Sequence, residues 1–409
     1  DRQMTDQNRV VIFDTTLRDG TQREGISLSC ADKIRIAEHL DALGVGCIEG
    51  GWPGSNPKDV EFFERAREVQ WRRARIVAFG STCRAKVPAE ADAGLTLQLD
   101  AGTEVVCLFG KSWTLHVTEV LRTTLDENLR MIRDSVARLQ AAGRRVIYDA
   151  EHFFDGYRAD PVYAVETLRA ASEGGASVLT LCDTNGGSLP WEVEAIVREV
   201  RTALAHPALA HPALAGTALA GQGNPVLGIH AHDDTGCAVA NTLAAVRAGA
   251  RHVQGTLNGY GERCGNANLC VAIPDLELKL GLSCLPNGHL PRLYEVAHAV
   301  AEIANLSPDE HMPYVGRSAF AHKAGVHVSA MRRHSDSYQH VDPGLVGNEM
   351  RVVVSELSGR SNLRSAVEEM GLDVDPDVDE AVLTRIKAEE ALGFSFEAAQ
   401  ASVELMLMR

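Results

Sequence analysis

The sequence predicts an α/β protein: a closed (β/α)8 TIM barrel followed by a smaller, mostly helical C-terminal region. Short β-branched runs alternate with longer amphipathic segments up to about residue 282, which is typical of parallel βαβ units. Eight such runs occur, the number that closes a barrel. The competing fold, a doubly wound open sheet, normally carries a glycine fingerprint after its first strand, and the sequence has none there.

Each predicted element follows from this alternation. The expected strands are residues 10–14, 45–50, 76–80, 105–110, 146–150, 178–182, 226–232 and 252–257. The helical patterns between them cover residues 31–43, 59–69, 125–142, 162–171, 191–204 and 236–248. We interpret the Ala-Leu-His-Pro repeat over residues 203–221 as a surface excursion that lengthens one helix–strand connection.

After about residue 285 the alternation stops. Helical patterns return at residues 290–305, 362–370 and 379–394, separated by a loop-rich stretch over residues 314–342 that holds many His and Arg residues. We therefore predict a barrel catalytic domain over residues 1–285 and helical subdomains over residues 286–409.

Composition excludes several classes of protein. Of the 409 residues 45% are apolar, an ordinary globular value, and the net charge of −15 argues against non-specific binding to nucleic acid or anionic membranes. No apolar run reaches the roughly 18 residues of a membrane span. The nine cysteines form no CxxC pair and lie mostly in apolar context, which indicates reduced thiols. We therefore expect a cytoplasmic protein.

Polar residues collect where the predicted strands end. Active sites of barrels lie at the carboxyl ends of the strands, and a purely structural barrel needs no ionisable group at nearly every end. The groups concerned are Arg18 and Asp19, Glu49, Glu151 and His152, Asp183 and Thr184, His230 and His232, and Glu262 and Arg263. The pattern favours an enzyme.

The His-x-His pair of the seventh strand is the sharpest local signal. His230 and His232 lie two apart on a strand and therefore share a face. With the carboxylate of Asp19, and with Asn266 adding a carbonyl oxygen, they form a candidate site for Zn²⁺, Mn²⁺, Co²⁺ or Mg²⁺. The alternative is a hydrogen-bonded core histidine.

Two further side chains suit an oxyanion or carboxylate. Arg18 places a fixed cation beside Asp19, where it would stabilise a substrate oxygen that becomes negative. Its alternative role is a structural salt bridge to Glu49 or Glu151. The hydroxyl of Thr184 is placed to hold a carboxylate.

These motifs resemble the metal-dependent barrel family that condenses acyl-CoA with keto acids, whose members include the isopropylmalate, homocitrate and citramalate synthases, with the hydroxymethylglutaryl-CoA lyases as relatives. The family motifs are DTTLRDGTQ at residues 14–22, HAHDD at 230–234 and GYGERCGN at 259–266. Four segments resemble the citramalate synthase branch: EGGWPGSNPKD at 49–59, LFGKSW at 108–113, YDAEHFF at 148–154 and SELSGR at 355–360.

The resemblance implies a role for each matching residue. It makes Asp19, His230, His232 and Asn266 the metal ligands, Arg18 the group that polarises the keto oxygen, and Thr184 the holder of the keto-acid carboxylate. Glu151 would lie beside the reacting centre. Tyr148 and His116 would line the substrate site.

The resemblance also implies a homodimer. His327 and Tyr338 match residues that reach the neighbouring subunit's barrel, so both would act in catalysis there. Family members usually carry a further C-terminal regulatory domain that senses the end-product amino acid. We expect that domain to be absent from this chain, and feedback inhibition with it.

The implied reaction is a Claisen-type condensation of pyruvate, acetyl-CoA and water to (R)-citramalate and CoA, a transferase step of isoleucine and hence branched-chain amino acid biosynthesis. A base must take a proton from the acetyl methyl group, and the candidates are Glu151 and the pair of His327 and Tyr338. We expect Leu108 and Phe109 to wall a pocket too small for a larger keto acid.

Four alternatives stay open. Isopropylmalate or homocitrate synthase would share the chemistry but take another keto acid, and an acyl-CoA lyase would cleave instead of condense. An iron oxygenase using the H-x-D pattern of residues 232–234 would need an antiparallel barrel, against the βα alternation. A non-enzymatic scaffold is the fourth.

Overall fold

A computed structural model describes residues 8–205, 225–322, 330, 334, 337–352, 363, 367, 376–396 and 400–408. The chain divides into two compact units, one of Asp1–Leu290 with Glu295–Ser307 and one of Pro291–Tyr294 with Pro308–Arg409. Most of helix α10 (Leu293–Ile303) therefore groups with the first unit, beyond the boundary expected at residue 285.

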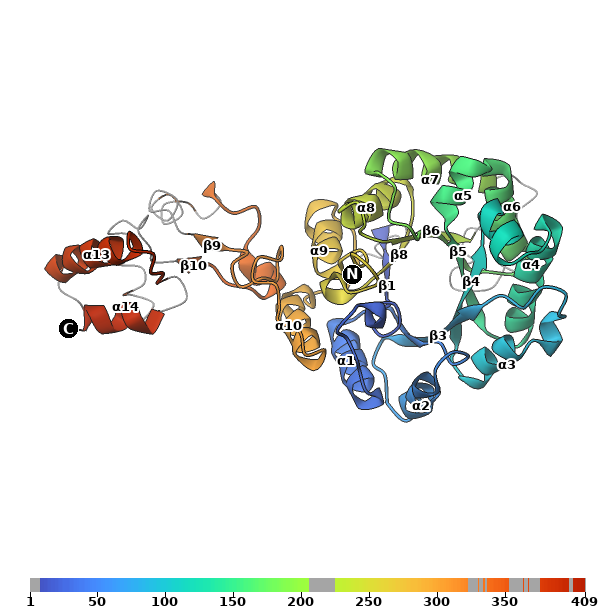
Figure 1. The fold of residues 1–409 in the computed structure, drawn as a ribbon, viewed down its shortest axis with the longest axis horizontal. Coiled ribbons are helices and arrows are strands. Elements are labelled where there is room, and N and C mark those ends of the chain that lie inside the picture. Colours follow the sequence, from blue (N-terminus) through green and yellow to red (C-terminus); the bar gives the residue numbers. More distant parts are fainter. Residues whose placement is uncertain are drawn as a thin grey trace. The chain divides into compact units, whose positions relative to one another are not determined.

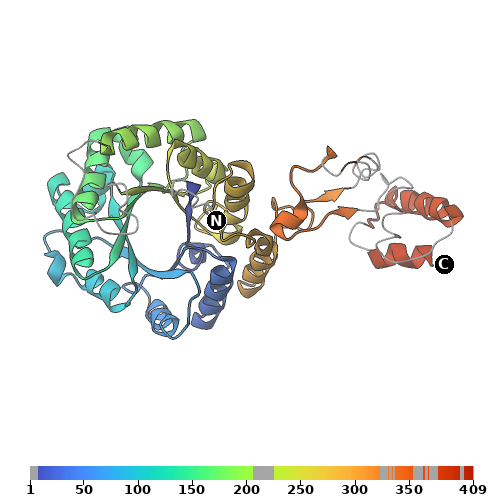
Figure 2. The same cartoon turned by 180° about the vertical axis from the view of Figure 1, so that it is seen from behind.

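The first unit is a closed barrel of eight parallel strands, which confirms the predicted fold. The strands are β1 (Val11–Asp14), β2 (Cys47–Gly51), β3 (Arg75–Ser81), β4 (Val105–Lys111), β5 (Arg145–Glu151), β6 (Val178–Asp183), β7 (Val226–Ala231) and β8 (His252–Gly255). Each pairs with the next in chain order, and β8 closes the ring on β1 with Val11 opposite His252. Figure 1 looks down the ring, and Figure 2 shows it from behind.

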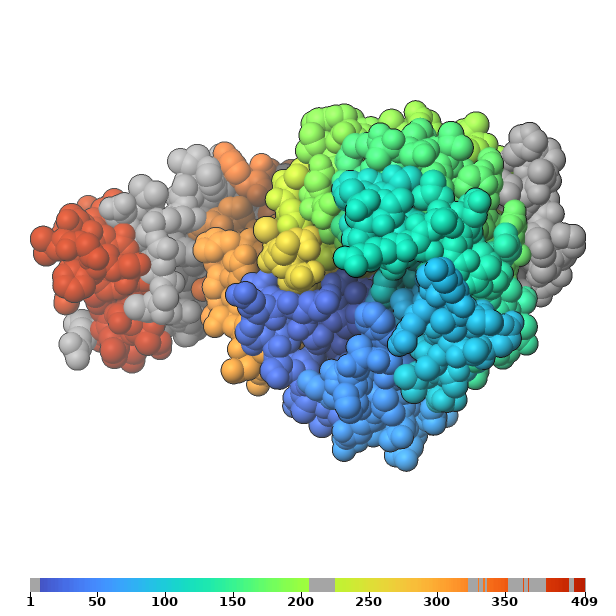
Figure 3. All heavy atoms as spheres, turned by 45° about the vertical axis from the view of Figure 1, so that its right-hand side comes forward, coloured from blue at the N-terminus to red at the C-terminus, as the bar shows by residue number. Residues whose placement is uncertain are grey.

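Helices cover the outside of the ring in chain order, as the colour sequence around the surface in Figure 3 shows. They are α1 (Cys30–Leu43), α2 (Pro57–Ala66), α3 (Ala93–Asp100), α4 (Leu125–Ala141), α5 (Phe153–Ala159), α6 (Pro161–Gly174), α7 (Pro190–Leu204), α8 (Ala238–Ala248) and α9 (Leu269–Pro274). Helix α1 begins with a reciprocal cap between Ser29 and Asp32 and is capped after Leu43 by Gly44, whose φ of 99° suits glycine best. Short helical turns occupy Gly20–Gln22, Ala89–Ala91, His116–Val120, Leu257–Gly259, Asp275–Lys279 and Leu290–Arg292.

The strands agree with the sequence-based expectation to within about two residues at most ends. Strand β7 ends at Ala231, so His232 begins the following loop, and β8 ends at Gly255 before a short helical turn. Helices α3, α5 and α9 were not predicted, because short helices carry too few turns for a clear periodicity. Most of the repeat over residues 203–221 lies outside the described residues.

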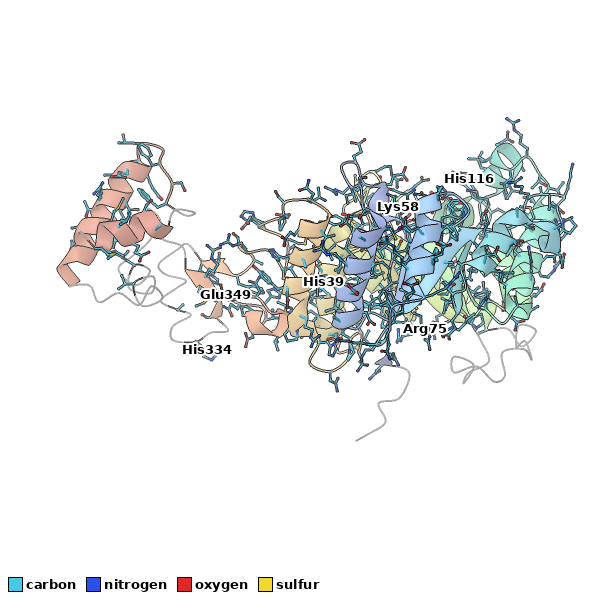
Figure 4. The ribbon with its side chains drawn as sticks, turned by 90° about the horizontal axis from the view of Figure 1, so that it is seen from below. His39, Lys58, Arg75, His116, His334 and Glu349 are labelled. Atoms are coloured by element: carbon cyan, nitrogen blue, oxygen red, sulfur yellow. The ribbon has the colours of Figure 1, made fainter. Side chains whose placement is uncertain are left out.

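Side chains alternate between the barrel interior and the helices. The interior apolar cluster takes Phe13, Cys47, Val77, Phe79, Val105, Cys107, Ile147 and Val178 from successive strands. Figure 4 shows the barrel from the side: His116, after β4, lies on one face, and Arg75, which begins β3, lies on the opposite face. Because the strands are parallel, the residues that follow them meet on the face that carries His116.

The second unit is small. Strands β9 (Ala321–His322) and β10 (Arg351–Val352) pair in parallel, and a 3-10 turn spans Pro343–Val346. Helices α13 (Pro376–Glu390) and α14 (Gln400–Leu407) share an apolar cluster that includes Ile386 and Val403. The helix expected over residues 362–370 falls almost wholly outside the described residues. Within the parts of both units that are described, the helices are too short or too polar to cross a membrane.

Candidate metal centre and active site

Three predicted metal ligands meet inside the barrel mouth. Asp19 Oδ2 lies 3.2 Å from His230 Nε2 and 3.9 Å from His232 Nε2, and the two ring nitrogens are 3.3 Å apart. All three side chains are buried. They form the group of metal-ligating side chains that the described residues bring together.

The loop after β1 is folded by its own short side chains. The buried Asp14 carboxylate accepts hydrogen bonds from the backbone and hydroxyl of Thr16. The Thr15 hydroxyl accepts from the backbone amide of Asp19 and donates to Glu49. These bonds turn the chain immediately after the strand, so that Arg18 and Asp19 both enter the mouth.

The loop after β8 delivers Asn266 to the same point. Its amide nitrogen lies 3.2 Å from Asp19 Oδ2 and 3.1 Å from His230 Nε2. Its oxygen packs against Gly261, which has a φ of 152° and where a Cβ would overlap that oxygen. Among the residues described, no group donates a hydrogen bond to this buried oxygen. An amide turned about its last bond would present the oxygen to the ligand cluster.

The charges of the cluster oppose the cost of burial. Burial raises the pKa of the Asp19 carboxyl, but Arg18 and the two histidines outweigh it and hold that pKa well below its usual range. Burial lowers the pKa of His230, and the hydrogen bond and charge of Asp19 raise it more. Burial and the neighbouring His230 lower the pKa of His232 to about 4, so its ring is neutral at pH 7.

The donor set fits a divalent cation. Nitrogen and oxygen ligands about 2.0–2.2 Å from one ion lie about 3.0–3.5 Å from each other. Two of the three separations in the cluster fall in this range, and the third is 3.9 Å. Two imidazole nitrogens that face each other at 3.3 Å, one of them on a neutral ring, need a shared proton or a cation between them.

Arg18 is held on three sides. Its Nε donates to Glu49 Oε2 at 2.6 Å, its Nη1 lies 3.3 Å from Asp19 Oδ2, and its guanidinium carbon lies 3.8 Å from the ring centroid of Phe79. The salt bridge to Glu49, the alternative role expected for Arg18, therefore forms beside the ligand cluster. A guanidinium held by these three contacts stays beside the ligand cluster.

Aromatic side chains form one wall of the mouth. Phe79 and Phe109 stack with centroids 5.2 Å apart, and Trp52 meets both rings edge-on at 5.7 and 5.5 Å. These three residues, together with the guanidinium of Arg18 on Phe79, are called the aromatic wall below.

Leu108 and Tyr148 were expected to line the substrate site, and the strand geometry does not bring them there. They neighbour each other across β4 and β5 on the face opposite to Phe109. A Cβ at Gly110, on the same face, would meet the Tyr148 hydroxyl and Ile132 of helix α4. Both side chains are therefore buried between strands and helices, because residues alternate along a strand.

The other expected residues lie around the rim. Glu151 ends β5 and pairs with Lys111 at the end of β4. The Thr184 hydroxyl accepts from the backbone amide of His152 at 2.9 Å and keeps its own proton to donate. His116 stacks on Trp113 and meets the ring of His152 edge-on at 4.3 Å.

The two residues expected from a neighbouring subunit lie in the second unit. His327 is outside the described residues. Tyr338 is described and 46% exposed.

Sequence reasoning missed several residues of the site. Gln254 in β8 and Asp149 in β5 are buried and hydrogen-bonded beneath the ligands. Trp52, Phe79 and Lys111 line the mouth. A polar residue at an inward position of a predicted strand is the signal that would have found Gln254, since most inward positions of this barrel are apolar.

Comparisons with known proteins agree with this geometry. The HMGL-like family model matches residues 9–300, and the model of the homocitrate synthase post-HMGL domain matches residues 314–392. The chain is 54% identical over 399 residues to an (R)-citramalate synthase of Streptomyces coelicolor, covering 97% of this chain and 71% of that protein. It is 53% identical to an (R)-citramalate synthase of Synechocystis, covering 98% and 72%. The solved hydroxymethylglutaryl-CoA lyase of Bacillus subtilis shares the fold, with a TM-score of 0.58, 20% identity, and coverage of 74% of this chain and 95% of the lyase.

Proposed function

The chain belongs to the HMGL-like family, and we propose that it catalyses the (R)-citramalate synthase reaction, in which pyruvate, acetyl-CoA and water give (R)-citramalate and CoA. One observation carries the proposal from the site itself: the buried cluster of Asp19, His230 and His232 has Arg18 fixed 3.3 Å from its carboxylate. A dicarboxylate product with a new tertiary alcohol requires a site of this kind, because the keto oxygen becomes negative during carbon–carbon bond formation.

Asp19, His230 and His232, with Asn266, would hold the divalent metal, which when bound supplies a Lewis acid for the carboxylate and keto oxygen of pyruvate. Arg18 adds a second positive group at the oxygen that becomes an alkoxide. The Thr184 hydroxyl donates to the pyruvate carboxylate. Both roles are electrostatic, and neither group needs to move during the reaction.

The chain must also move a proton from the acetyl methyl group. Glu151 stands at the end of β5, across the ring from β1, and Lys111 pairs with it. This carboxylate is one candidate base, and the pair of His327 and Tyr338 is the other. The enolate carbon then attacks the keto carbon of pyruvate, the alkoxide takes up a proton, and water hydrolyses the thioester to release CoA.

The aromatic wall sets the size of the keto acid. Its rings are rigid and contact each other, so they cannot move apart easily to accommodate a keto acid with a branched side chain. The methyl group of pyruvate fits beside such a wall better than the isopropyl group of 2-oxoisovalerate. Of the two wall residues expected from the sequence, Phe109 keeps this role.

A homodimer that exchanges His327 and Tyr338 between subunits is part of the proposal. Light scattering on the full chain measures the assembly. Mixing an inactive His327→Ala chain with an inactive Asp19→Asn chain tests the exchange, because a mixed dimer regains one complete site. No recovery on mixing would contradict it.

The reaction is tested by thiol release with acetyl-CoA and one of three keto acids: pyruvate, 2-oxoisovalerate or 2-oxoglutarate. We expect release with pyruvate by metal-loaded protein, loss on metal removal, and (R)-citramalate as the product on chiral chromatography. Preferred use of another keto acid would assign the chain to isopropylmalate or homocitrate synthesis. Cleavage of an acyl-CoA without condensation would assign it to the lyases.

A further inference from the structure

Beneath the ligand cluster, four strands contribute polar side chains to one buried network. His230 Nδ1 lies 2.8 Å from Gln254 Oε1, and Gln254 Nε2 lies 2.8 Å from Asp149 Oδ1. The same amide nitrogen lies 3.3 Å from Thr180 Oγ1 and 3.4 Å from His252 Nε2. All five side chains are buried in the barrel interior.

The direction of each hydrogen bond follows from chemistry. A carboxylate oxygen accepts, so Gln254 must turn its NH₂ group toward Asp149. Its two amide hydrogens then face Asp149 and the acceptors of Thr180 and His252, and its oxygen faces His230. An amide oxygen only accepts, so His230 must carry a proton on Nδ1 and donate it.

This arrangement decides which nitrogen of His230 serves the cluster. With Nδ1 protonated, the lone pair of the neutral ring stands on Nε2, the atom that faces Asp19 and His232. Were the amide of Gln254 reversed, the opposite tautomer would be favoured and a hydrogen would occupy the ligand position. Mutation of a residue that hydrogen-bonds to a metal ligand in this way commonly lowers metal affinity 10- to 100-fold.

We propose that Gln254 and Asp149 are positioning residues for the metal site: Asp149 fixes the Gln254 amide, and Gln254 fixes the tautomer of His230. The inference rests on the proposed metal site. It also accounts for a buried carboxylate and amide in an interior that is otherwise largely apolar, where unpaired polar groups are costly.

The test measures Zn²⁺ affinity by competition with a chromophoric chelator. Gln254→Met keeps the length of the side chain and removes its acceptor, so we expect the Zn²⁺ dissociation constant to rise 10- to 100-fold. Thr180→Val is the matched control, because it removes a partner of the same amide without touching the bond to His230. It should bind Zn²⁺ within about threefold of the parent, clearly less than the roughly 10-fold minimum expected when the partner of a ligating histidine is lost.

A reciprocal exchange separates this role from packing. In the double variant Asp149→Asn with Gln254→Glu, the residue at 149 donates and the residue at 254 accepts. An oxygen still faces Nδ1 of His230, so this double variant should bind Zn²⁺ nearly as tightly as the parent and more tightly than Gln254→Met. Urea unfolding of each metal-free variant checks that the chain is folded, and Gln254→Asn, which withdraws the amide by one methylene, replaces the methionine variant if that does not fold.

A second readout observes the proton itself. In ¹⁵N-histidine-labelled, Zn²⁺-loaded parent, the His230 Nδ1 proton should give an exchange-protected resonance that Gln254→Met loses. Three results would each overturn the proposal. They are a parent-like Zn²⁺ affinity in Gln254→Met, a Zn²⁺ affinity in Thr180→Val as low as in Gln254→Met, and a double variant whose Zn²⁺ affinity stays below that of the parent. Citramalate formation by the parent is measured in a separate assay. If that assay shows no citramalate, the proposed function fails, and the Zn²⁺ affinities of the variants still test the role of Gln254 and Asp149.

Discussion

Removing Arg18 should affect stability and activity through different partners. The Arg18→Met variant leaves Glu49, which is fully buried, without its cation. Burial already raises the pKa of Glu49, and Arg18 is the main group that lowers it. Breaking a buried pair costs about 3–5 kcal/mol. The residual exposure of Arg18 and proton uptake by Glu49 favour the lower end, about 3 kcal/mol of unfolding free energy.

The double variant Arg18→Met with Glu49→Gln removes the orphaned charge. The amide oxygen that Glu49→Gln introduces still accepts from Thr15, so the part of the loss that comes from the unpaired Glu49 should be recovered, and the loss of Arg18 beside Asp19 should remain. Activity should not return with it. Loss of one positioned group at a developing oxyanion costs about 10²- to 10³-fold in kcat, or about 2.7–4 kcal/mol.

Two assays read the two effects. Urea unfolding gives the stability of the parent, Arg18→Met, Glu49→Gln and the double variant, and thiol release gives kcat and KM for pyruvate. We expect kcat to fall equally in both variants that lack Arg18. If kcat recovers together with stability in the double variant, Arg18 acts only as a structural partner of Glu49, and its catalytic assignment is wrong.

Three further results are expected. Removing the metal with a chelator should abolish thiol release. Added Zn²⁺ should restore the activity of the parent but not that of Asp19→Asn, and equal restoration of both proteins would contradict the ligand assignment. Burial raises the pKa of Asp14 from 3.8 to about 7, so the folded state favours the protonated carboxyl. This preference adds up to about 4 kcal/mol to the unfolding free energy below pH 4, and the stabilisation is lost as the pH rises through 7. Urea unfolding at several pH values should show this slope in the parent and not in Asp14→Asn, and an unchanged slope would count against it. Phe109→Ala should raise kcat/KM for 2-oxoisovalerate relative to pyruvate about tenfold, whereas Leu108→Val, on the opposite face of the strand, should leave the ratio as it is. An unaltered ratio in Phe109→Ala would refute the aromatic wall.

The order of elements along the barrel was predictable from the sequence because strand and helix periodicities are local. Each β-branched run became a strand of the barrel, and the HAHDD motif placed His230 and His232 at one strand end. The alternation of side chains also follows from sequence once a strand's register is known. Leu108 and Tyr148, both expected at the substrate site, instead face the helices. The pairing of β4 with β5 puts Phe109 and Ile147 on the inward face, and Leu108 and Tyr148 alternate with them.

The sequence by itself determined the eightfold alternation, the polar strand ends and the identity of the three side chains that meet as a candidate metal site. Only the tertiary structure decided which side chains meet across the ring. Gln254 and Asp149 lie 105 residues apart, and Arg18, from the loop after β1, stacks on Phe79 of β3. Such pairs depend on the tilt and stagger with which β8 closes on β1, a property of the whole ring that no local pattern of residues encodes.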